Sequence, residues 1–268
     1  MKQILKTALA ALVAAGGFAA AQPAAAQQTD SRLYRVTSSG TLRVCQYPNY
    51  YAISYRNPQT SEIEGIDADL SKELAKELGV ELEIVESSFG TFIADLQADK
   101  CEIGMFGIGA TLQRAQAVAF SDPYLVSSIY AVTTKDSEIK AWEDIDQDGV
   151  RVVVTLGSYI EPFMRGYLKK AELITVAPPA SREGEVIAGR ADVLMTDYPT
   201  SVKLASLFDW VNTLEPEGSL RPTPYSYVVP QGDQIWLNYV NLFVSTIKLD
   251  GRLQQFAEKN ALGPIVAP

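Results

Sequence analysis

The chain of 268 residues is 47% apolar and carries a formal net charge of −9 at neutral pH. This length allows one large domain or two of ordinary size, and the share of apolar residues argues against intrinsic disorder. The excess of acidic residues argues against nucleic acids and anionic membranes as partners. The sequence contains no histidine, which excludes histidine-based catalytic triads and histidine-rich metal sites.

The first 26 residues have the features of a secretory signal peptide. Lys2 and Lys6 form a basic start, residues 8–21 form an apolar stretch of small side chains, and residues 24–26 form an Ala-Ala-Ala cleavage site. No cysteine follows this site, so we do not expect a lipid anchor. Removal of the leader leaves 21 basic and 32 acidic residues, a net charge of −11. We therefore expect a protein free in a bacterial periplasm.

Two cysteines, Cys45 and Cys101, invite a disulfide in an oxidising compartment. Cys45 lies at the end of one expected strand, whereas Cys101 lies just before the start of another. In a parallel sheet these two positions are far apart, and a disulfide needs Cα atoms within about 7 Å. We therefore expect two buried free thiols.

Strands and helices alternate along the first half of the chain. We expect strands over residues 42–45, 81–85 and 103–106, and helices over 66–78 and 91–98. The first helix has leucines at four-residue spacing and ends at Gly79. A glycine-rich turn follows residue 106, and we expect a further helix to start at Thr111.

The second half repeats this alternation. We expect a β-rich run over 126–134, strands over 150–156, 173–176, 192–195 and 225–229, and helices over 159–170, 183–188, 199–207, 236–247 and 251–260. Strands that alternate with helices of this size indicate βαβ units and a mostly parallel sheet. The fold class is therefore α/β.

Arg114 lies in the first turn of the helix expected at Thr111. A strand that ends in glycine and opens onto a helix N-terminus offers unpaired N–H groups and partial positive charge to an anion. An arginine there can hold a carboxylate through two parallel hydrogen bonds. The alternative is a surface arginine on an ordinary helix, and the spacing alone leaves both possibilities open.

Thr111-x-x-Arg114, followed by Phe-Ser-x-Pro-Tyr at residues 120–124, resembles the core motif of the amino-acid-type (family 3) periplasmic solute-binding proteins of ABC importers. The resemblance extends from about residue 42 to about residue 262. It implies a two-lobe type II periplasmic-binding-protein fold, in which each lobe is a mostly parallel sheet flanked by helices.

The resemblance also implies lobe boundaries and partners. Lobe 1 takes residues 30–125 and 225–268, lobe 2 takes residues 126–224, and two crossings near 126–128 and 222–225 form the hinge. Members of the family bind a small ligand and deliver it to an ABC permease in the inner membrane. We expect a monomer that needs no cofactor and no metal.

Ligands of open α/β sheets bind beyond the carboxyl ends of the strands, which selects the same loops as the motif. In the family the arginine of the motif, here Arg114, holds the ligand α-carboxylate. Asp197 matches the aspartate that holds the α-amino group in related proteins, although it could simply cap the following helix. The expected ligand-binding residues are Tyr47, Tyr50, Phe89, Phe106, Gly107, Gly109, Thr111, Arg114, Ser158, Tyr159 and Asp197.

Departures from the family pattern bear on the ligand. Many relatives carry an acidic residue at the position of Tyr47, so its loss argues against a basic amino acid. Phe106, Gly107 and Gly109 replace small hydroxyl residues of relatives that bind polar amino acids. The backbone N–H donors remain, but the hydroxyl contacts are lost. With Tyr50, which matches an aromatic that stacks on the ligand, these residues favour an amino acid with an apolar or aromatic side chain.

The family also has an enzymatic branch, the periplasmic cyclohexadienyl dehydratases, which act on prephenate and arogenate. Several stretches resemble that branch; they are residues 31–35, 39–44, 54–56, 144–150, 168–171 and 195–197. In such an enzyme Glu161 would protonate the leaving hydroxyl. The loops at 106–109 and 157–161 depart from the branch, so we expect a binding protein rather than an enzyme. A binding component that serves a secreted oxidoreductase or a sensor remains a third possibility.

Overall fold

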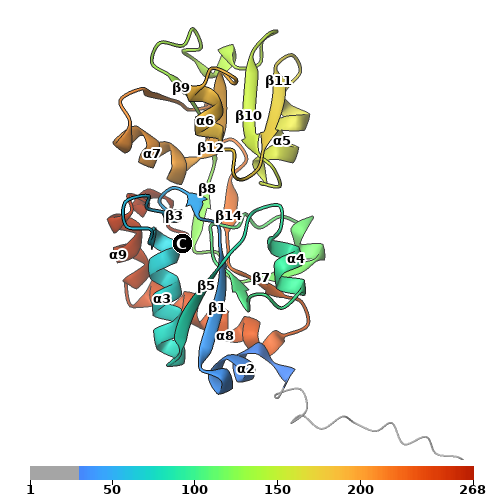
Figure 1. Cartoon of the computed structure of the whole chain (residues 1–268), viewed down its shortest axis with the longest axis vertical. Helices are drawn as coiled ribbons and strands as arrows, with labels where there is room; N and C mark the ends of the chain where they lie inside the picture. Colours follow the sequence, from blue (N-terminus) through green and yellow to red (C-terminus); the bar gives the residue numbers. More distant parts are fainter. Residues whose placement is uncertain (1–29) are drawn as a thin grey trace, which may run out of the picture.

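The computed structural model describes residues 30–268, so the signal peptide expected over residues 1–26 lies outside the described residues. The described chain forms two five-stranded sheets in separate lobes (Figure 1). Two antiparallel strands, β8 (Leu125–Ser127) and β14 (Thr223–Tyr225), lie between the lobes. The two-lobe α/β architecture predicted from the sequence is confirmed.

The first sheet has the order β5-β1-β6-β15-β7. Its strands are β1 (Thr41–Gln46), β5 (Glu81–Glu86), β6 (Ile103–Gly104), β7 (Val118–Phe120) and β15 (Val228–Pro230). Strands β5 and β6 run parallel to β1, whereas β15 runs antiparallel to β6 and β7. Strand β15 comes from the C-terminal part of the chain, so the first lobe is built from two separate segments.

The second sheet has the order β11-β10-β12-β9-β13. Its strands are β9 (Ile129–Thr134), β10 (Arg151–Thr155), β11 (Glu172–Val176), β12 (Val193–Asp197) and β13 (Val211–Leu214). Strands β11 and β12 run parallel to β10, whereas β9 runs antiparallel to β12 and β13. In each sheet one strand therefore runs antiparallel to the other four, and the two lobes share the same strand topology.

The helices cover the faces of these sheets, and those of the first lobe are α2 (Arg32–Ser39), α3 (Ile66–Leu78), α4 (Phe92–Gln97), α8 (Gln234–Leu249) and α9 (Arg252–Lys259). Those of the second lobe are α5 (Ile160–Tyr167), α6 (Arg182–Ile187) and α7 (Tyr198–Leu207). Short 3-10 turns lie at Arg114–Gln116, Trp142–Asp144 and Gly263–Ile265. A small antiparallel ribbon contains β2 (Asn49–Tyr50), β3 (Ser54–Arg56) and β4 (Ile63–Glu64).

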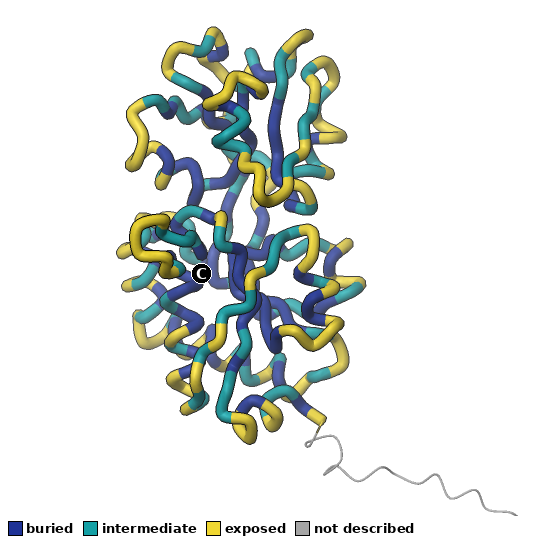
Figure 2. Tube along the Cα trace, in the orientation of Figure 1, coloured by how far each residue is buried: buried dark blue, intermediate teal, exposed yellow. Residues whose placement is uncertain are grey.

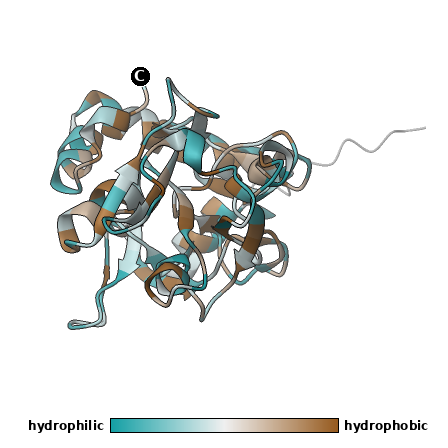
Figure 3. Cartoon of the chain, turned by 90° about the horizontal axis from the view of Figure 1, so that it is seen from above, coloured by the Kyte–Doolittle hydropathy of each residue, from teal (hydrophilic) through white to brown (hydrophobic). Residues whose placement is uncertain are grey.

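Burial follows the sheets, since the central strands are buried and the outer turns are exposed (Figure 2). The helices carry both hydrophilic and hydrophobic residues, as surface helices do (Figure 3). One buried apolar cluster extends from Val44 in the first sheet to Val154 in the second. The lobes are therefore packed against each other. No helix within residues 30–268 combines the length and the apolar character that crossing a membrane requires.

Several expected elements differ from the structure. The helix expected at Thr111 is wrong: that segment holds only the three-residue turn Arg114–Gln116. The β-rich run over 126–134 and the strand over 225–229 each divide between two sheets, because the chain passes from one lobe to the other there. Helix α2, the β2–β4 ribbon and strand β13 were not expected. We propose that β8 and β14 form the hinge, and we retain the predicted lobe boundaries as a proposal.

The expectation of two free thiols is wrong, because Cys45 and Cys101 form a disulfide with their Cα atoms 5.6 Å apart. The error lies in the assumed register between the two strands. Strand β6 has only two residues and starts opposite Val44, near the end of β1. The residues just before β6 therefore lie beside the last residues of β1, rather than at the opposite end of the sheet.

This disulfide closes a segment with a sequence separation of 56 residues. We predict that replacing both Cys45 and Cys101 by alanine lowers the free energy of unfolding by about 2–4 kcal/mol, because the unfolded chain regains the freedom of that loop. Urea unfolding with and without reductant measures the effect. Reductant should weaken the wild-type protein and leave the double variant unchanged. Equal stability of the wild-type protein in both conditions would contradict the prediction.

Candidate functional site

The loop after β6 brings two glycines against two tyrosine rings. Gly107 has a φ of +60°, and a Cβ atom there would lie 2.8 Å from Cε1 of Tyr50. A Cβ atom at Gly109 would lie 2.8 Å from Cδ1 of Tyr159. Any larger residue would displace these rings, since real Cβ atoms essentially never approach so closely. The glycines that replace the hydroxyl residues of relatives thus make room for aromatic side chains.

Arg114 is 8% exposed and joins the two lobes. Its Nη1 donates to the carbonyl of Gly109 at 2.8 Å, and its Nη2 donates to the carbonyl of Gly157 at 2.9 Å. Its guanidinium carbon lies 5.7 Å from the ring centre of Phe89 and 5.3 Å from that of Phe92. Burial lowers the pKa of Arg114 to about 10, so the group remains a cation at neutral pH.

The surroundings of Arg114 differ from those expected. Arg114 does not lie in an α-helix but opens the three-residue 3-10 turn Arg114–Gln116, where the hydroxyl of Thr111 accepts its backbone N–H at 3.2 Å. Within this segment the group that can bind an anion is therefore the guanidinium and not the N-terminus of a helix. Arg114 has five N–H donors, and two backbone carbonyls leave the remaining ones for a ligand.

Asp197 ends β12 and takes the helix-capping role expected for it. Its Oδ1 accepts the backbone N–H of Thr200 at 3.3 Å, which caps helix α7. Its Oδ2 accepts hydrogen bonds from the hydroxyls of Tyr50 and Tyr225. The capping role is thus present, and the other oxygen points toward the first lobe, where the sequence places the ligand.

Three tyrosines form a cluster between Arg114 and Asp197. The hydroxyl of Tyr225 lies 3.2 Å from that of Tyr50 and 3.3 Å from that of Tyr159. Burial raises the pKa of Tyr159, the negative charge of Asp197 raises it further, and Arg114 lowers it, so the Tyr159 hydroxyl feels both charges. Sequence analysis missed Tyr225, because a tyrosine in a hinge strand carries no signal of its own.

The remaining expected aromatics pack on one another. Phe89 lies 5.3 Å from Tyr47, 5.6 Å from Tyr50 and 5.3 Å from Phe106, measured between ring centres. Phe106 is fully buried and makes an edge contact with Phe92. Tyr47, Tyr50 and Phe106 therefore form a core between the lobes. Of this group, Phe89 also borders open space.

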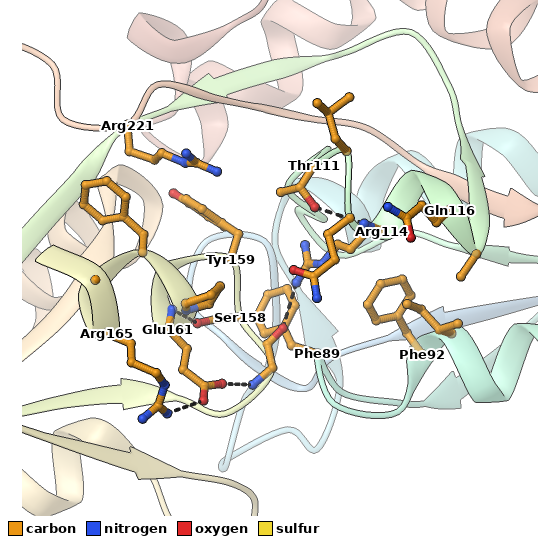
Figure 4. A pocket seen from close by; sticks show the side chains of 18 of the residues that line it. Phe89, Phe92, Thr111, Arg114, Gln116, Ser158, Tyr159, Glu161, Arg165 and Arg221 are labelled. Carbon is orange, nitrogen blue, oxygen red and sulfur yellow. Dashed lines mark hydrogen bonds and ion pairs between the residues drawn. The ribbon is translucent and has the colours of Figure 1, made fainter.

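A cleft of about 1150 Å³ opens beside this core. Figure 4 shows it with Arg114 and Phe89 on one side and Tyr159 and Arg221 on the other. Its lining includes five of the predicted ligand-binding residues, which are Phe89, Thr111, Arg114, Ser158 and Tyr159. Sequence analysis missed Phe92, Phe163, Arg165, Tyr167 and Arg221.

Glu161 and Ser158 lie at the start of helix α5 on the cleft wall. Glu161 accepts the backbone N–H of Gly157 at 2.7 Å and pairs with Arg165 at 2.9 Å (Figure 4). The hydroxyl of Ser158 accepts the backbone N–H of Glu161 at 3.3 Å. These contacts make Glu161 part of the start of helix α5.

A family model of bacterial extracellular solute-binding proteins, family 3, matches residues 42–262. The chain belongs to this family. The Thr111–Arg114 motif falls within the matched residues, so the family assignment made from it is confirmed.

Relatives of this family 3 protein include both an enzyme and binding proteins. Cyclohexadienyl dehydratase of Pseudomonas aeruginosa is 30% identical over 88% of this chain and 88% of its own. The L-cystine-binding protein of Escherichia coli is 26% identical over 85% of each chain. The solved structure of an ancestral amino acid-binding protein, a precursor of cyclohexadienyl dehydratase, is 34% identical with a TM-score of 0.79, and covers 85% of this chain and 99% of its own.

Asp67, at the start of α3, accepts a hydrogen bond from the backbone of the Gly107 loop. Its Oδ2 accepts the Gly107 N–H at 2.7 Å and the Tyr124 hydroxyl at 2.6 Å, and its Oδ1 accepts the Tyr227 hydroxyl at 3.3 Å. The side chain is fully buried, and no basic side chain bonds to it within the described residues. Burial raises the pKa of Asp67 to about 7, against the lowering effect of these hydrogen bonds.

We predict that the buried carboxyl group of Asp67 makes the free energy of unfolding depend on pH. The folded protein keeps the Asp67 proton up to about pH 7, whereas the unfolded chain loses it near pH 4. The stability of the wild-type protein relative to Asp67→Asn should therefore fall by roughly 1.4 kcal/mol per pH unit from pH 4 to pH 7, and stay level above pH 7.

Urea unfolding of both proteins across this pH range measures the difference. Asp69→Asn is a control on the same helix, since Asp69 pairs with Lys259 at 2.8 Å. A stability difference between the wild-type protein and Asp67→Asn that stays constant from pH 4 to pH 7 would show that Asp67 does not hold a proton in the folded state.

Proposed function

We propose that this protein is the binding component of an ABC importer, and that its lobes close around a small carboxylate-bearing solute with an apolar or aromatic body. The observation that carries the proposal is Arg114. It is a buried cation at the wall of a cleft that five aromatic side chains also line. A guanidinium in such a place binds a carboxylate strongly, because water competes little for its donors.

An amino acid with an apolar or aromatic side chain is the ligand type that the sequence predicts within this class. Its carboxylate would bind Arg114, and its ammonium group would bind Asp197. The ammonium group would have to replace a tyrosine hydroxyl there, since Oδ2 of Asp197 already accepts two. The ring of Phe89 and that of Tyr159 would contact the side chain.

We further propose that the protein acts as a monomer in the periplasm and passes its ligand to an ABC permease. The family match supports a role outside the cytoplasm. The signal peptide predicted over residues 1–26 supports the same location. Service to a secreted oxidoreductase or to a sensor would use the same cleft, and dependence of uptake on a permease gene encoded nearby would distinguish the roles.

The proposal is tested by a thermal-shift screen over amino acids and small organic acids, followed by calorimetry with Arg114→Ala. A ligand at about a hundred times its Kd should stabilise the wild-type protein by roughly 2.7 kcal/mol. We predict that Arg114→Ala weakens binding by about 2–4 kcal/mol and that Arg114→Lys recovers only part of it, because the planar fork is lost.

Arg190→Ala is the matched control, since Arg190 is exposed and pairs with Glu185 at 2.7 Å. It removes the same charge and should leave binding unchanged. A screen without any response to a carboxylate, or normal binding by Arg114→Ala, would refute the proposal.

A dehydratase is the second candidate function, favoured by the 30% identical enzyme among the relatives. Glu161 would then donate a proton to the leaving hydroxyl of prephenate. Its position argues against this role, because an amide and a guanidinium donate to its two oxygens. Both oxygens of Glu161 are thus bound by groups of its own segment, so neither is free to approach the leaving hydroxyl of a substrate.

We predict that the purified protein leaves prephenate unchanged beyond its spontaneous decay, and that Glu161→Gln has no effect on this rate. Formation of phenylpyruvate, followed by absorbance, measures it. Arg165→Gln is the control, because it breaks the same ion pair and keeps the carboxyl group. Faster turnover by the wild-type protein and by Arg165→Gln than by Glu161→Gln would establish the enzyme instead, since loss of a general acid falls on kcat.

A further inference from the structure

The carboxylate of Asp197 has all its acceptor positions in use. Its Oδ2 accepts from Tyr50 and Tyr225, and its Oδ1 accepts the Thr200 N–H at 3.3 Å and lies 3.4 Å from the Thr196 hydroxyl. A carboxylate offers about four such positions. An ammonium group can therefore reach Asp197 only by displacing a donor that is already bound.

Displacement is costly because the whole cluster is buried. Asp197 is 3% exposed, Tyr50 is 5% exposed and Tyr225 is fully buried. A displaced hydroxyl would find no water to replace the lost bond, and an unpaired buried donor costs free energy. A cation also stands nearby already, since Arg182 donates to the Thr196 hydroxyl at 3.1 Å.

Tyr50 is held in this position by the backbone around it. Its ring lies where a Cβ atom of residue 107 would be, so only glycine there admits it. Its other side packs on Phe89 and Tyr47. Because Tyr50 belongs to strand β2 and Asp197 to strand β12, the hydrogen bond between them also ties the first lobe to the second.

The open cleft itself carries a surplus of positive charge. Among the described residues that line it, the charged ones are Arg114, Arg165, Arg221 and Glu161. Glu161 pairs with Arg165, so the cleft presents no free carboxylate to a cation. Arg221 forms no ion pair within residues 30–268 and stands 5.6 Å from the ring centre of Phe163. Charge complementarity therefore favours an anion without a cationic group.

We propose that the cleft takes small organic acids that carry no ammonium group, and that Tyr50 sets this preference by occupying the carboxylate on which an ammonium group would depend. The inference rests on the proposed function, since it assumes a carboxylate ligand. It narrows the class of carboxylate-bearing solutes to those without an ammonium group. The acid group of such a ligand binds Arg114 or Arg221, and its apolar or aromatic body packs on Phe89 and Phe163.

The test compares pairs of ligands that differ only in the α-ammonium group. They are 3-phenylpropanoate with L-phenylalanine, 3-(4-hydroxyphenyl)propanoate with L-tyrosine, and 4-methylpentanoate with L-leucine. Calorimetry should show that the wild-type protein binds at least one acid about tenfold or more tightly than its amino acid partner, the effect of one charge-assisted hydrogen bond. In Tyr50→Phe this ratio should shift toward the amino acid by about tenfold, since an acceptor position of Asp197 becomes vacant.

Tyr55→Phe is the matched control, because Tyr55 stacks on Tyr51 in the same ribbon and its hydroxyl does not bond to Asp197. Its ratio should equal that of the wild-type protein. Wild-type protein that binds an amino acid as tightly as the matching acid, or a ratio unchanged in Tyr50→Phe, overturns this inference and leaves the proposed function intact. If the protein binds no member of any pair and no other carboxylate in the screen, both this inference and the proposed function are overturned.

Discussion

The closed arrangement of the two lobes depends on the guanidinium of Arg114. It donates to the carbonyl of Gly109 in the first lobe and to that of Gly157 in the second; the first of these bonds is buried and the second is part-buried. A buried cation needs compensation, because desolvation penalises the charged form. Carbonyl dipoles and the ring of Phe89 provide part of it here. A bound carboxylate would provide the rest, which makes the interlobe contact and ligand recognition two properties of a single side chain.

Close contact around this cation is possible because three positions have no side chain. Gly107 and Gly109 admit the rings of Tyr50 and Tyr159, and Gly157 has a φ of +75° and lies against the backbone of Gly90 across the lobe interface. The site exchanges small hydroxyl residues on the loop for large phenols that reach in from elsewhere. Polar contacts are thus preserved but come from different elements. In the proposed preference for acids without an ammonium group, the hydroxyls of the tyrosine cluster take the acceptor positions of Asp197 that such a group would need.

Asp67 and Asp197 are both buried carboxyl groups, but their different hydrogen-bond partners give them different roles. Asp67 accepts only neutral donors beneath the Gly107 loop, and burial raises its pKa toward neutrality. Asp197 combines a helix cap with two phenol contacts between the lobes. The first holds the shape of the loop, and the second holds the lobes together. Both act on the binding region through backbone or tyrosine groups rather than by facing the open cleft.

Local patterns in the chain were enough to predict the family, the α/β class and most strands and helices, because apolar periodicity and the 111–124 motif are properties of short segments. They also selected Arg114 and Asp197, whose residue types match their chemistry. The register of β6 against β1, which decides whether Cys45 meets Cys101, appeared only once the sheet was assembled. The same holds for the contacts of Tyr50, Tyr225 and Arg221, because they join segments that no local pattern connects. The amino-acid sequence therefore identified Arg114 and Asp197 by their charge and position, whereas packing between the lobes decided which of their hydrogen-bonding positions are already occupied and added Arg165 and Arg221 to the cleft.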